Sequence, residues 1–234
     1  MYAALINGIA VAVAALCGVL FKNKINEKYT SAILLGLAIV VGIIGASYAI
    51  GTEDTLGMIL CIVAGILFGE WINIEKHLNR LGDMLKNKFS AESGNDNTFT
   101  EGFVASSLLF CIGPMAIIGS LQAGTMGDAT IIFSKTVIDC ITALSFAVAL
   151  GAGVIFSGVS VLLYQGLLTL LAVWVSPYLG DAVINEMSAI GGVLMIAISL
   201  NMLGIKKIRV GNMLPAVFLP ILYQPFAHWL TNLF

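Results

Sequence analysis

The chain has 234 residues, of which 59% are hydrophobic and only 10% are charged, and its formal net charge is −2. A soluble domain usually has about 25% charged residues, so most of this surface must face lipid or other apolar helices. The small net charge also argues against the basic surface that nucleic-acid binding uses. We therefore expect an integral membrane protein that binds no nucleic acid.

Eight apolar stretches have roughly the length needed to cross a bilayer as helices. A helical span needs about 20 apolar residues, and the alternating polarity of membrane β-strands is absent from the sequence. The predicted fold class is therefore all-α, a polytopic transmembrane helical bundle of about eight spans. The predicted spans are residues 2–21, 31–50, 55–72, 101–120, 129–150, 155–175, 187–205 and 212–232.

Ten of the 11 basic residues lie in three of the loops between these spans. An even number of spans separates the three loops, so all three lie on one side of the membrane, which the positive-inside rule makes cytoplasmic. Both termini are then predicted to lie outside, in a cell inner (plasma) membrane. The ten residues are Lys22, Lys24, Lys28, Lys76, Arg80, Lys86, Lys88, Lys206, Lys207 and Arg209.

Residues 73–100 form the one sizeable polar segment between the predicted spans. Ile74, Leu78 and Leu85 recur at helical spacing, with charged residues on the other faces. This pattern predicts an amphipathic helix on the cytoplasmic membrane surface, followed by a polar linker. The segment is either a docking or regulatory arm or a solvated connector that lies on the lipid headgroups.

Spans one to three and six to eight show weak mutual similarity. Asn7-Gly8 in the first span matches Gln165-Gly166 in the sixth, and two further short matches follow at similar offsets. Because five spans separate the members of each pair, the repeats would be inverted, as in many secondary transporters with a solute site near the midplane. The hypothesis divides a single membrane domain into a first repeat (1–72), the arm (73–100), a central helix pair (101–150) and a second repeat (155–234).

Gly113 and Pro114 interrupt the fourth predicted span. Proline removes a backbone donor and clashes with the preceding turn, so nearby carbonyls need partners from protein, water or a solute. Two interpretations stay open from the sequence. The span is either a broken helix that exposes polar backbone at a site or a kinked helix that packs tightly.

The fifth predicted span contains the basic residue that is outside the three loops. If this span begins near Asp128, Lys135 lies about 10 Å deep and Asp139 about 16 Å deep, near the midplane. They are four residues apart and can pair on one helix face. Asp139 is then a proton- or cation-carrying carboxylate balanced by Lys135, or the two form a neutral structural pair that locks helices together. Ser134 and Thr142 add hydroxyl groups to this helix.

Further polar residues complete the predicted ion or solute pathway. Asn7 and Gln165 lie within spans, where they either line a cavity or hydrogen-bond across helices. The full set of pathway residues is Asp139, Lys135, Gly113, Pro114, Ser134, Thr142, Asp128, Asn7 and Gln165.

The sequence shows no motif of a known enzyme class. It contains no phosphate-binding loop, no HExxH, no GxSxG and no dinucleotide fingerprint. The four cysteines lie singly in apolar segments without a CxxC pair, which favours packing over metal binding. We therefore expect a protein that is not an enzyme, with no catalytic residue, no metal site and no cofactor.

Four stretches resemble one family of bacterial membrane proteins. They are LLFCIGPMAIIGSLQAG, SKTVIDCITALSFA, LLYQG and NMLGIKKIRVGNMLPA. They resemble the uncharacterised inner-membrane family typified by YdfK and YqgA, and the similarity covers essentially the whole chain. The resemblance implies a compact multi-span protein, described at most as a transport protein without an assigned substrate. No functional residue is transferred from it.

The leading hypothesis is a secondary transporter or channel for an ion or small solute, with its site at the fourth and fifth spans. Asp139 favours a cation or proton as the solute, whereas Lys135 favours an anion. The alternative is a non-transporting membrane scaffold or a sensor that acts through the arm, with the bundle packed shut. The expected partners are the lipid bilayer, the solute and, through glycine-rich helix faces, a second copy of the chain.

Overall fold

The computed structural model describes residues 1–22, 27–89 and 98–231. Within these ranges the secondary structure is helical and no strand occurs, which confirms the all-α class. Six helices are long and apolar enough to cross a membrane, or seven if one bent pair counts as a single span. Lys24 and most of the predicted linker, at 90–97, lie outside the described residues.

The chain forms two compact units. Unit 1 contains Met1–Leu37, Lys76–Cys111 and Met115–Val173, and unit 2 contains Ala38–Glu75, Ile112–Pro114 and Trp174–Phe234. The helices are α1 (Tyr2–Lys22), α2 (Glu27–Ile50), α3 (Thr55–Ile72), α4 (Ile74–Phe89), α5 (Thr98–Ile112), α6 (Pro114–Thr125), α7 (Thr130–Leu150), η1 (Ala152–Phe156), α8 (Ser157–Val175), η2 (Ser176–Tyr178), α9 (Asp181–Met202), α10 (Val210–Phe218) and α11 (Pro220–Thr231).

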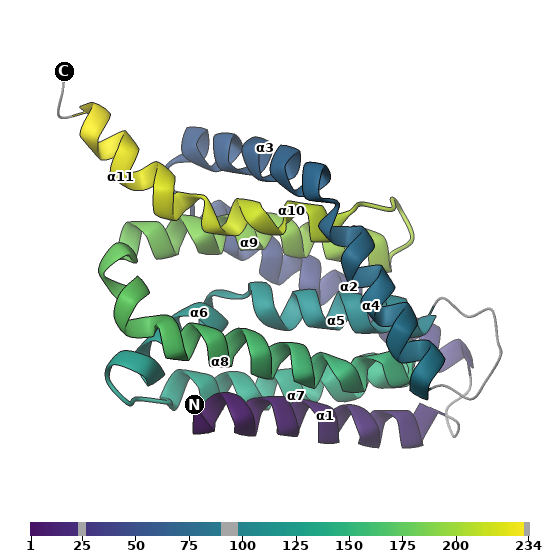
Figure 1. The fold of residues 1–234 in the computed structure, drawn as a ribbon. Coiled ribbons are helices and arrows are strands. Elements are labelled where there is room, and N and C mark those ends of the chain that lie inside the picture. Colours follow the sequence, from purple (N-terminus) through teal and green to yellow (C-terminus); the bar gives the residue numbers. More distant parts are fainter. Residues whose placement is uncertain (23–26, 90–97, 232–234) are drawn as a thin grey trace. The chain divides into compact units, whose positions relative to one another are not determined.

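In unit 1, α1, α7 and α8 lie side by side (Figure 1). The contact between α1 and α8 depends on glycine, because a Cβ atom on Gly8 would lie 2.7 Å from the carbonyl oxygen of Gly158. Such close backbone approach is typical of helix packing in membranes, where small residues replace the hydrophobic driving force. On α7, the buried residues Ile132, Lys135 and Asp139 recur at intervals of three and four and form one packed face.

The fourth predicted span is divided into two helices. α5 ends at Ile112, α6 begins at Pro114, and their axes differ by 58°. Proline is well suited to the first position of a helix because the N–H that it lacks would have no partner there. Of the two interpretations open from the sequence, the structure contains the broken helix.

In unit 2, glycine also marks the helix contacts. α2 approaches α9 where a Cβ atom on Gly45 would lie 2.7 Å from the carbonyl oxygen of Gly192. α3 approaches α10 at Gly65 and Gly69, where the backbone of α10 occupies the space that a side chain would need. Small residues therefore set both contacts.

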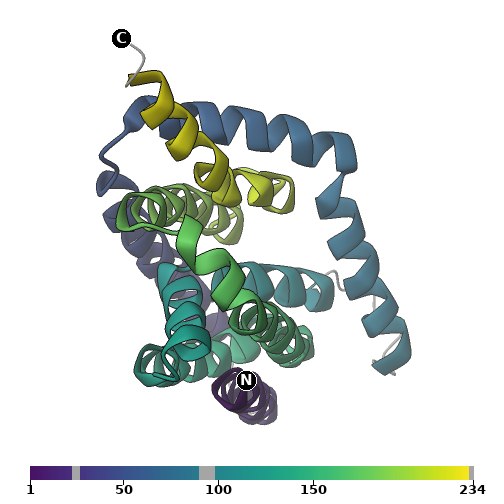
Figure 2. The same ribbon diagram turned by 60° about the vertical axis from the view of Figure 1, so that its left-hand side comes forward.

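Two predicted spans in unit 2 have different bounds from those expected. The seventh was predicted to begin at residue 187, but α9 begins at Asp181. The eighth is divided into α10 and α11, and Pro220 is the first residue of α11, which leaves α10 in a new direction (Figure 2). Neither of these helices has 18 residues, so neither is among the six candidate spans.

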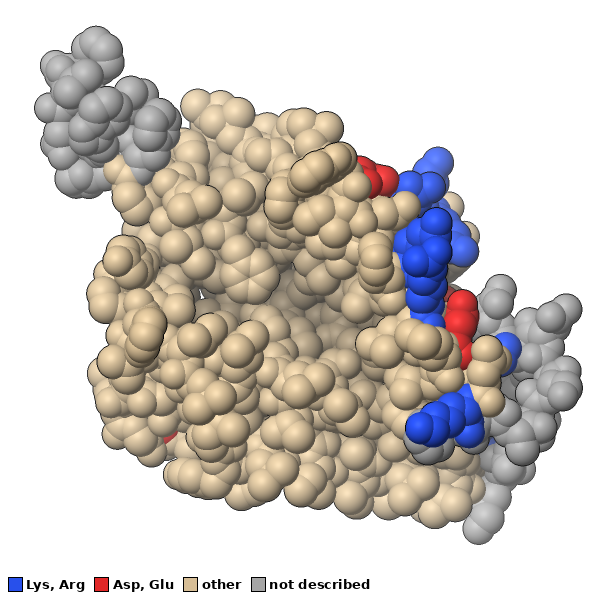
Figure 3. Space-filling model, viewed as in Figure 1, with Lys and Arg blue, Asp and Glu red and all other residues tan. Residues whose placement is uncertain are grey.

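The surfaces of the helices are apolar to a degree that suits a lipid environment. Trp71, Trp174 and Leu163 expose 67% or more of their surface. Figure 3 shows a face on which uncharged residues, drawn in tan, cover almost everything outside one margin. Large exposed apolar areas of this kind are rare on soluble monomers, so the structure agrees with a membrane-embedded helical protein.

Candidate functional site

Two charged side chains lie in the interior of unit 1. Lys135 and Asp139 occupy the buried face of α7, and the Nζ atom of Lys135 donates a hydrogen bond to Oδ2 of Asp139. Only 6% and 7% of the two side chains is exposed. The i,i+4 pair predicted from the sequence is therefore present, and it is buried.

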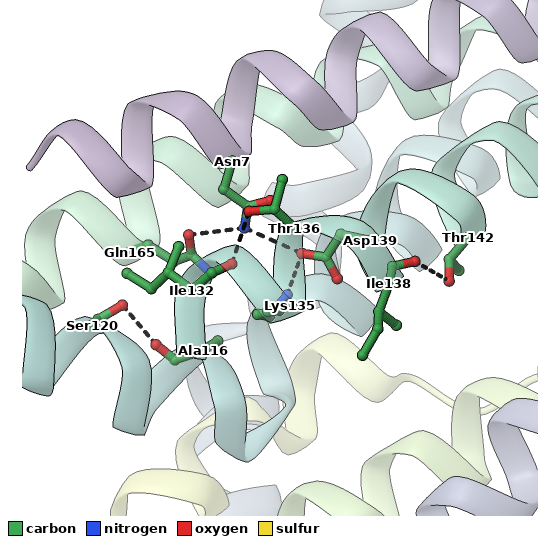
Figure 4. Close-up of polar contacts among 10 residues, drawn as sticks. All are labelled: Asn7, Ala116, Ser120, Ile132, Lys135, Thr136, Ile138, Asp139, Thr142 and Gln165. Atoms are coloured by element: carbon green, nitrogen blue, oxygen red, sulfur yellow. Dashed lines mark hydrogen bonds and ion pairs between the residues drawn. The ribbon is translucent and has the colours of Figure 1, made fainter. Parts of the chain in front are cut away.

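Two amide side chains from other helices complete this arrangement, as Figure 4 shows. The Nδ2 atom of Asn7 on α1 donates to Oδ2 of Asp139 at 3.2 Å and to Oε1 of Gln165 on α8 at 3.0 Å. Asn7 and Gln165 are both fully buried. We call these four residues, Asn7, Lys135, Asp139 and Gln165, the polar cluster.

The polar cluster contains hydrogen-bonding groups that have no partner. Among the described residues, Oδ1 of Asn7, Nε2 of Gln165 and Oγ1 of Thr169 are buried without a hydrogen bond. Thr169 lies one helical turn beyond Gln165 on α8. Each such group costs about 1–3 kcal/mol when it is left unsatisfied. Buried groups of this kind usually bind water or a ligand.

Few groups that interact electrostatically lie near the ion pair. The ammonium group of Lys135 lies 5.8 Å from the ring centre of Phe110 on α5, a favourable cation–π distance. Within the described part of unit 1, Lys135 and Asp139 are the two fully buried charged residues. A single charge near the midplane costs at least about 2.5–3.5 kcal/mol on insertion scales, so each charge makes the other tolerable.

Three predicted pathway residues lie away from the polar cluster. The hydroxyl groups of Ser134 and Thr142 donate to the carbonyl oxygens of Thr130 and Ile138 on their own helix. Asp128 precedes α7, where it is exposed and accepts hydrogen bonds from Thr130. The structure does not bring these three together with Asp139. Ser134 is exposed because it faces away from the packed side of α7.

Asp128 instead stabilises the start of α7. Its Oδ1 atom accepts from the backbone N–H of Thr130 at 2.9 Å and from the Thr130 hydroxyl at 2.6 Å. These hydrogen bonds favour the ionised form and lower the pKa of the Asp128 carboxyl. These contacts of Asp128 are therefore local: it lies one residue before Ala129, the N-cap of α7, and bonds to the first residue of the helix.

Gly113 and Pro114 form the break between α5 and α6. A Cβ atom on Gly113 would meet no atom within 4 Å, so space is open beside this residue. A helix that starts at Pro114 leaves the N–H groups of its first turn without intrahelical acceptors. The break therefore leaves polar backbone groups between α5 and α6, which one of the two interpretations open from the sequence requires.

Three residues with notable polar or aromatic contacts were not among the predicted pathway residues. Phe110 is an ordinary residue of an apolar helix, and only the packing of α5 brings its ring near Lys135. Thr169 lies one helical turn beyond Gln165 on α8 and has a buried hydroxyl without a partner. The predicted bounds of the sixth and seventh spans leave Glu186 in the loop between them, but in unit 2 it is a buried residue of α9. Its carboxylate accepts hydrogen bonds from the hydroxyl of Thr52 and the backbone N–H groups of Glu53 and Asp54. An acidic residue in the first turns of a helix was the available signal.

The polar cluster lacks the composition of a metal centre. Over the described ranges, no group of three or more His, Cys, Asp or Glu residues could hold a metal ion. The cysteines are free thiols, three of them half-buried and Cys61 buried. The chemistry available to the cluster is therefore hydrogen bonding, ion pairing and proton transfer.

Comparisons with known proteins agree with this membrane architecture. Residues 2–224 match the family described as Protein of unknown function (DUF554). The chain is 28% identical to Uncharacterized membrane protein YdfK of Bacillus subtilis (strain 168), with 94% of each chain covered. It is 31% identical to Uncharacterized protein YqgA of Escherichia coli (strain K12), with 92% of each covered. No solved structure matches the chain.

Proposed function

Because the chain belongs to the DUF554 family of membrane proteins, for which no activity is described, we propose its function from the polar cluster. The proposed function is a secondary transporter or channel for an ion or small solute, with the site at Asp139 and Lys135 on α7. The single observation that carries the proposal is the buried ion pair bonded to amides from two other helices.

A buried ion pair is costly because both charges lose their contact with water. Two apolar residues of similar volume would usually pack at least as stably as a buried ion pair, so such a pair is weak evidence for a stabilising role. Ionisable residues within membrane helices are rare and mark ion or substrate pathways. The unpartnered atoms of Asn7, Gln165 and Thr169 add unused hydrogen-bonding capacity around the pair. Transport uses these features, whereas a closed structural bundle has no need for them.

The break between α5 and α6 is a second support. Discontinuous helices in membranes are tolerated where the freed backbone lines a cavity or binds an ion or solute. Pro114 begins α6, and the 58° bend leaves the ends of both helices within one predicted span. This geometry resembles the half-helices of secondary transporters.

We also propose that α1–α3 and α8–α11 form an inverted repeat. In unit 1, Gly8 faces Gly158 and Asn7 bonds to Gln165, so α1 contacts its proposed counterpart. In unit 2, Gly45 faces Gly192, and α3 contacts α10 through glycine in the same manner. Each proposed pair of counterparts therefore meets at small residues, which supports the repeat.

The proposed transport function is tested by replacing Asp139 with asparagine, its uncharged isostere. Purified protein is reconstituted into proteoliposomes, and the fluxes of protons, sodium, potassium and chloride are followed with a lumenal pH dye and isotopes. We expect a protein-dependent net flux down an imposed gradient, which Asp139→Asn lowers at least tenfold. Ser145→Ala is the matched control, because its hydroxyl bonds to the Ile141 carbonyl of the same helix and lies outside the cluster. Wild-type flux in the Asp139→Asn protein would refute the proposed role of the carboxylate.

The alternative function is a non-transporting scaffold or sensor. One observation favours it: Lys135 and Asp139 are bonded to one another and nearly inaccessible. A structural pair predicts no flux from the wild type. It also predicts that Asp139→Asn lowers the melting temperature in detergent by leaving Lys135 unpaired. Stability and flux measured on the same preparations separate the two functions.

A further inference from the structure

The polar cluster is electrically balanced, and this restricts what it can bind. Its one ammonium and one carboxylate cancel, and the described interior of unit 1 has no further buried charge. Binding a lone cation or anion would leave one net charge in a low-dielectric interior, which is strongly unfavourable. A charged solute therefore binds at low cost only together with a compensating change of charge, such as proton uptake or release.

The hydrogen-bonding groups of the cluster contain more donors than acceptors. The ammonium group of Lys135 has three N–H donors, of which one has an acceptor among the described residues, Asp139. The Nε2 atom of Gln165 has two further N–H groups without an acceptor, and Thr169 has a free hydroxyl. Against these stand two oxygens that accept no hydrogen bond among the described residues, Oδ1 of Asn7 and Oδ1 of Asp139. A surplus of donors is complementary to a ligand rich in acceptors.

A metal cation does not match this arrangement. Hard cations are bound by several oxygen ligands at once. At Asp139, however, Oδ2 accepts from the N–H donors of Lys135 and Asn7, so Oδ1 is the one carboxylate oxygen left for a cation, which would have to bind close to the ammonium group of Lys135. A proton needs no such coordination shell, and it can be held by the carboxylate alone.

These observations lead to a defined charge cycle. When Asp139 takes a proton from solvent, its carboxylate becomes a neutral acid, and the hydrogen bond from Lys135 loses the negative charge of its acceptor. Lys135 stays an ammonium ion and is left without a counter-ion in an apolar interior. An anion placed beside it restores neutrality, and no covalent bond in the solute is made or broken.

We propose that the polar cluster binds a small anion together with a proton, the anion against Lys135, Gln165 and Thr169 and the proton on Asp139. This inference rests on the proposed transport function and names its substrate class. Transport through the cluster is then electroneutral symport of one proton with one negative charge.

Few other groups near the pair can titrate. Cys111 on α5 and Cys140 on α7 are close enough to interact with it electrostatically, and Tyr164 on α8 lies near Cys111. Thiols and phenols ordinarily ionise above neutral pH. α6, α8 and η1 carry no charged residue, the charged residue of α5 is Glu101, in its first turn, and that of α1 is Lys22, in its last turn. Asp139 is therefore the group that takes up the proton.

The experiment uses the full-length protein in proteoliposomes that contain the pH dye pyranine. Inward gradients of chloride, nitrate or phosphate are imposed at equal pH on both sides, with gluconate as the replacing anion. We expect at least one of the three anions to acidify the lumen at least tenfold faster than in protein-free vesicles. Setting the membrane potential with potassium and valinomycin should leave that rate unchanged, because no net charge moves.

Variants of Asp139 and Lys135 distinguish a loss of proton–anion coupling from a loss of folded protein. Asp139→Asn should lose anion-driven acidification at least tenfold while it retains exchange of isotope-labelled anion at equal concentrations. Lys135→Met should lose both activities. If its unpaired carboxylate prevents folding, the neutral double variant Lys135→Met with Asp139→Asn takes its place and should also lose both. Ser145→Ala should behave as the wild type.

Three other outcomes would contradict the inference, and they differ in whether the proposed transport function fails with it. If a sodium or potassium gradient moves protons through Asp139 and no anion does, the protein exchanges cations, so the anion inference fails and the transport function stands. If Asp139→Asn retains anion-driven acidification, the proton is carried elsewhere and the inference fails. If folded protein moves none of the tested ions, the inference and the proposed function fail together.

Discussion

At the scale of residues, position on the helix decides what a polar side chain on α7 does. Lys135 and Asp139 lie on the packed face and meet Asn7 and Gln165, whereas Ser134 bonds to its own backbone. The pairing of Lys135 with Asp139 was predictable because an i,i+4 spacing follows from helix geometry alone. The bonds from Asn7 to Asp139 and Gln165 were not, because they depend on how α1 and α8 pack.

The stability of the folded protein should depend on pH through Asp128. Its pKa is lowered in the folded protein by the hydrogen bonds from Thr130, so it contributes stability at a pH above the ordinary aspartate pKa. That stability is lost as the pH falls through the lowered, folded-state pKa. We therefore expect Asp128→Ala to lower the melting temperature in detergent at neutral pH, with a difference from wild type that shrinks in strong acid. A difference that stays constant with pH would exclude a role for the ionised carboxylate.

At the scale of elements, glycine and proline determine where helices meet and where they end. Gly8 and Gly45 permit backbone contact with α8 and α9. Pro114 and Pro220 are each the first residue of a helix that follows a break. The position of Pro114 indicated a kink or a break in advance. The 58° angle between α5 and α6 was not predictable, because it depends on what the two helices pack against.

A pair of glycine variants in unit 1 tests the close helix contact. We expect Gly8→Ala to destabilise the protein by about 1–3 kcal/mol, because the new methyl group would overlap Gly158 and Leu162. Gly36→Ala is the control, since its Cβ atom meets nothing within 4 Å and alanine favours a helix by up to about 1 kcal/mol. Unfolding in a denaturing detergent titration gives both values. Equal effects of the two substitutions would contradict the packing role of Gly8.

At the scale of the whole molecule, charge is sorted toward one end within each unit. In unit 2, Arg209 pairs with Glu70 near the end of α3 at 3.0 Å, and Lys206 and Lys207 belong to the same connection. The connection between α2 and α3, which holds Thr52, contains no basic residue. In unit 1, Lys22 ends α1 and its Nζ atom lies beside Gly151, just after α7. This asymmetry is what the positive-inside rule uses.

Labelling of cysteines on either side of α9 tests the orientation. Gly180 precedes this helix, Lys206 follows it, and its 22 residues extend about 33 Å, enough to cross the hydrocarbon core. In a variant without the native cysteines, we expect an impermeant maleimide to label Gly180→Cys in intact cells. Lys206→Cys should react only after the membrane is opened. The reverse pattern would invert the predicted topology, and labelling of both in intact cells would mean that α9 does not cross the membrane.

The sequence by itself determined the membrane environment, the all-helical class, most of the helix positions and the pairing of Lys135 with Asp139. These follow from composition, from the length of apolar stretches and from the periodicity of one helix, which are local properties of the chain. Only the tertiary structure decided that Asn7 and Gln165 join the pair and that Glu186 is a buried residue of a helix. It also decided that the fourth span is broken. The physical reason is that each of these features depends on contacts between residues far apart in the chain, which local patterns do not encode.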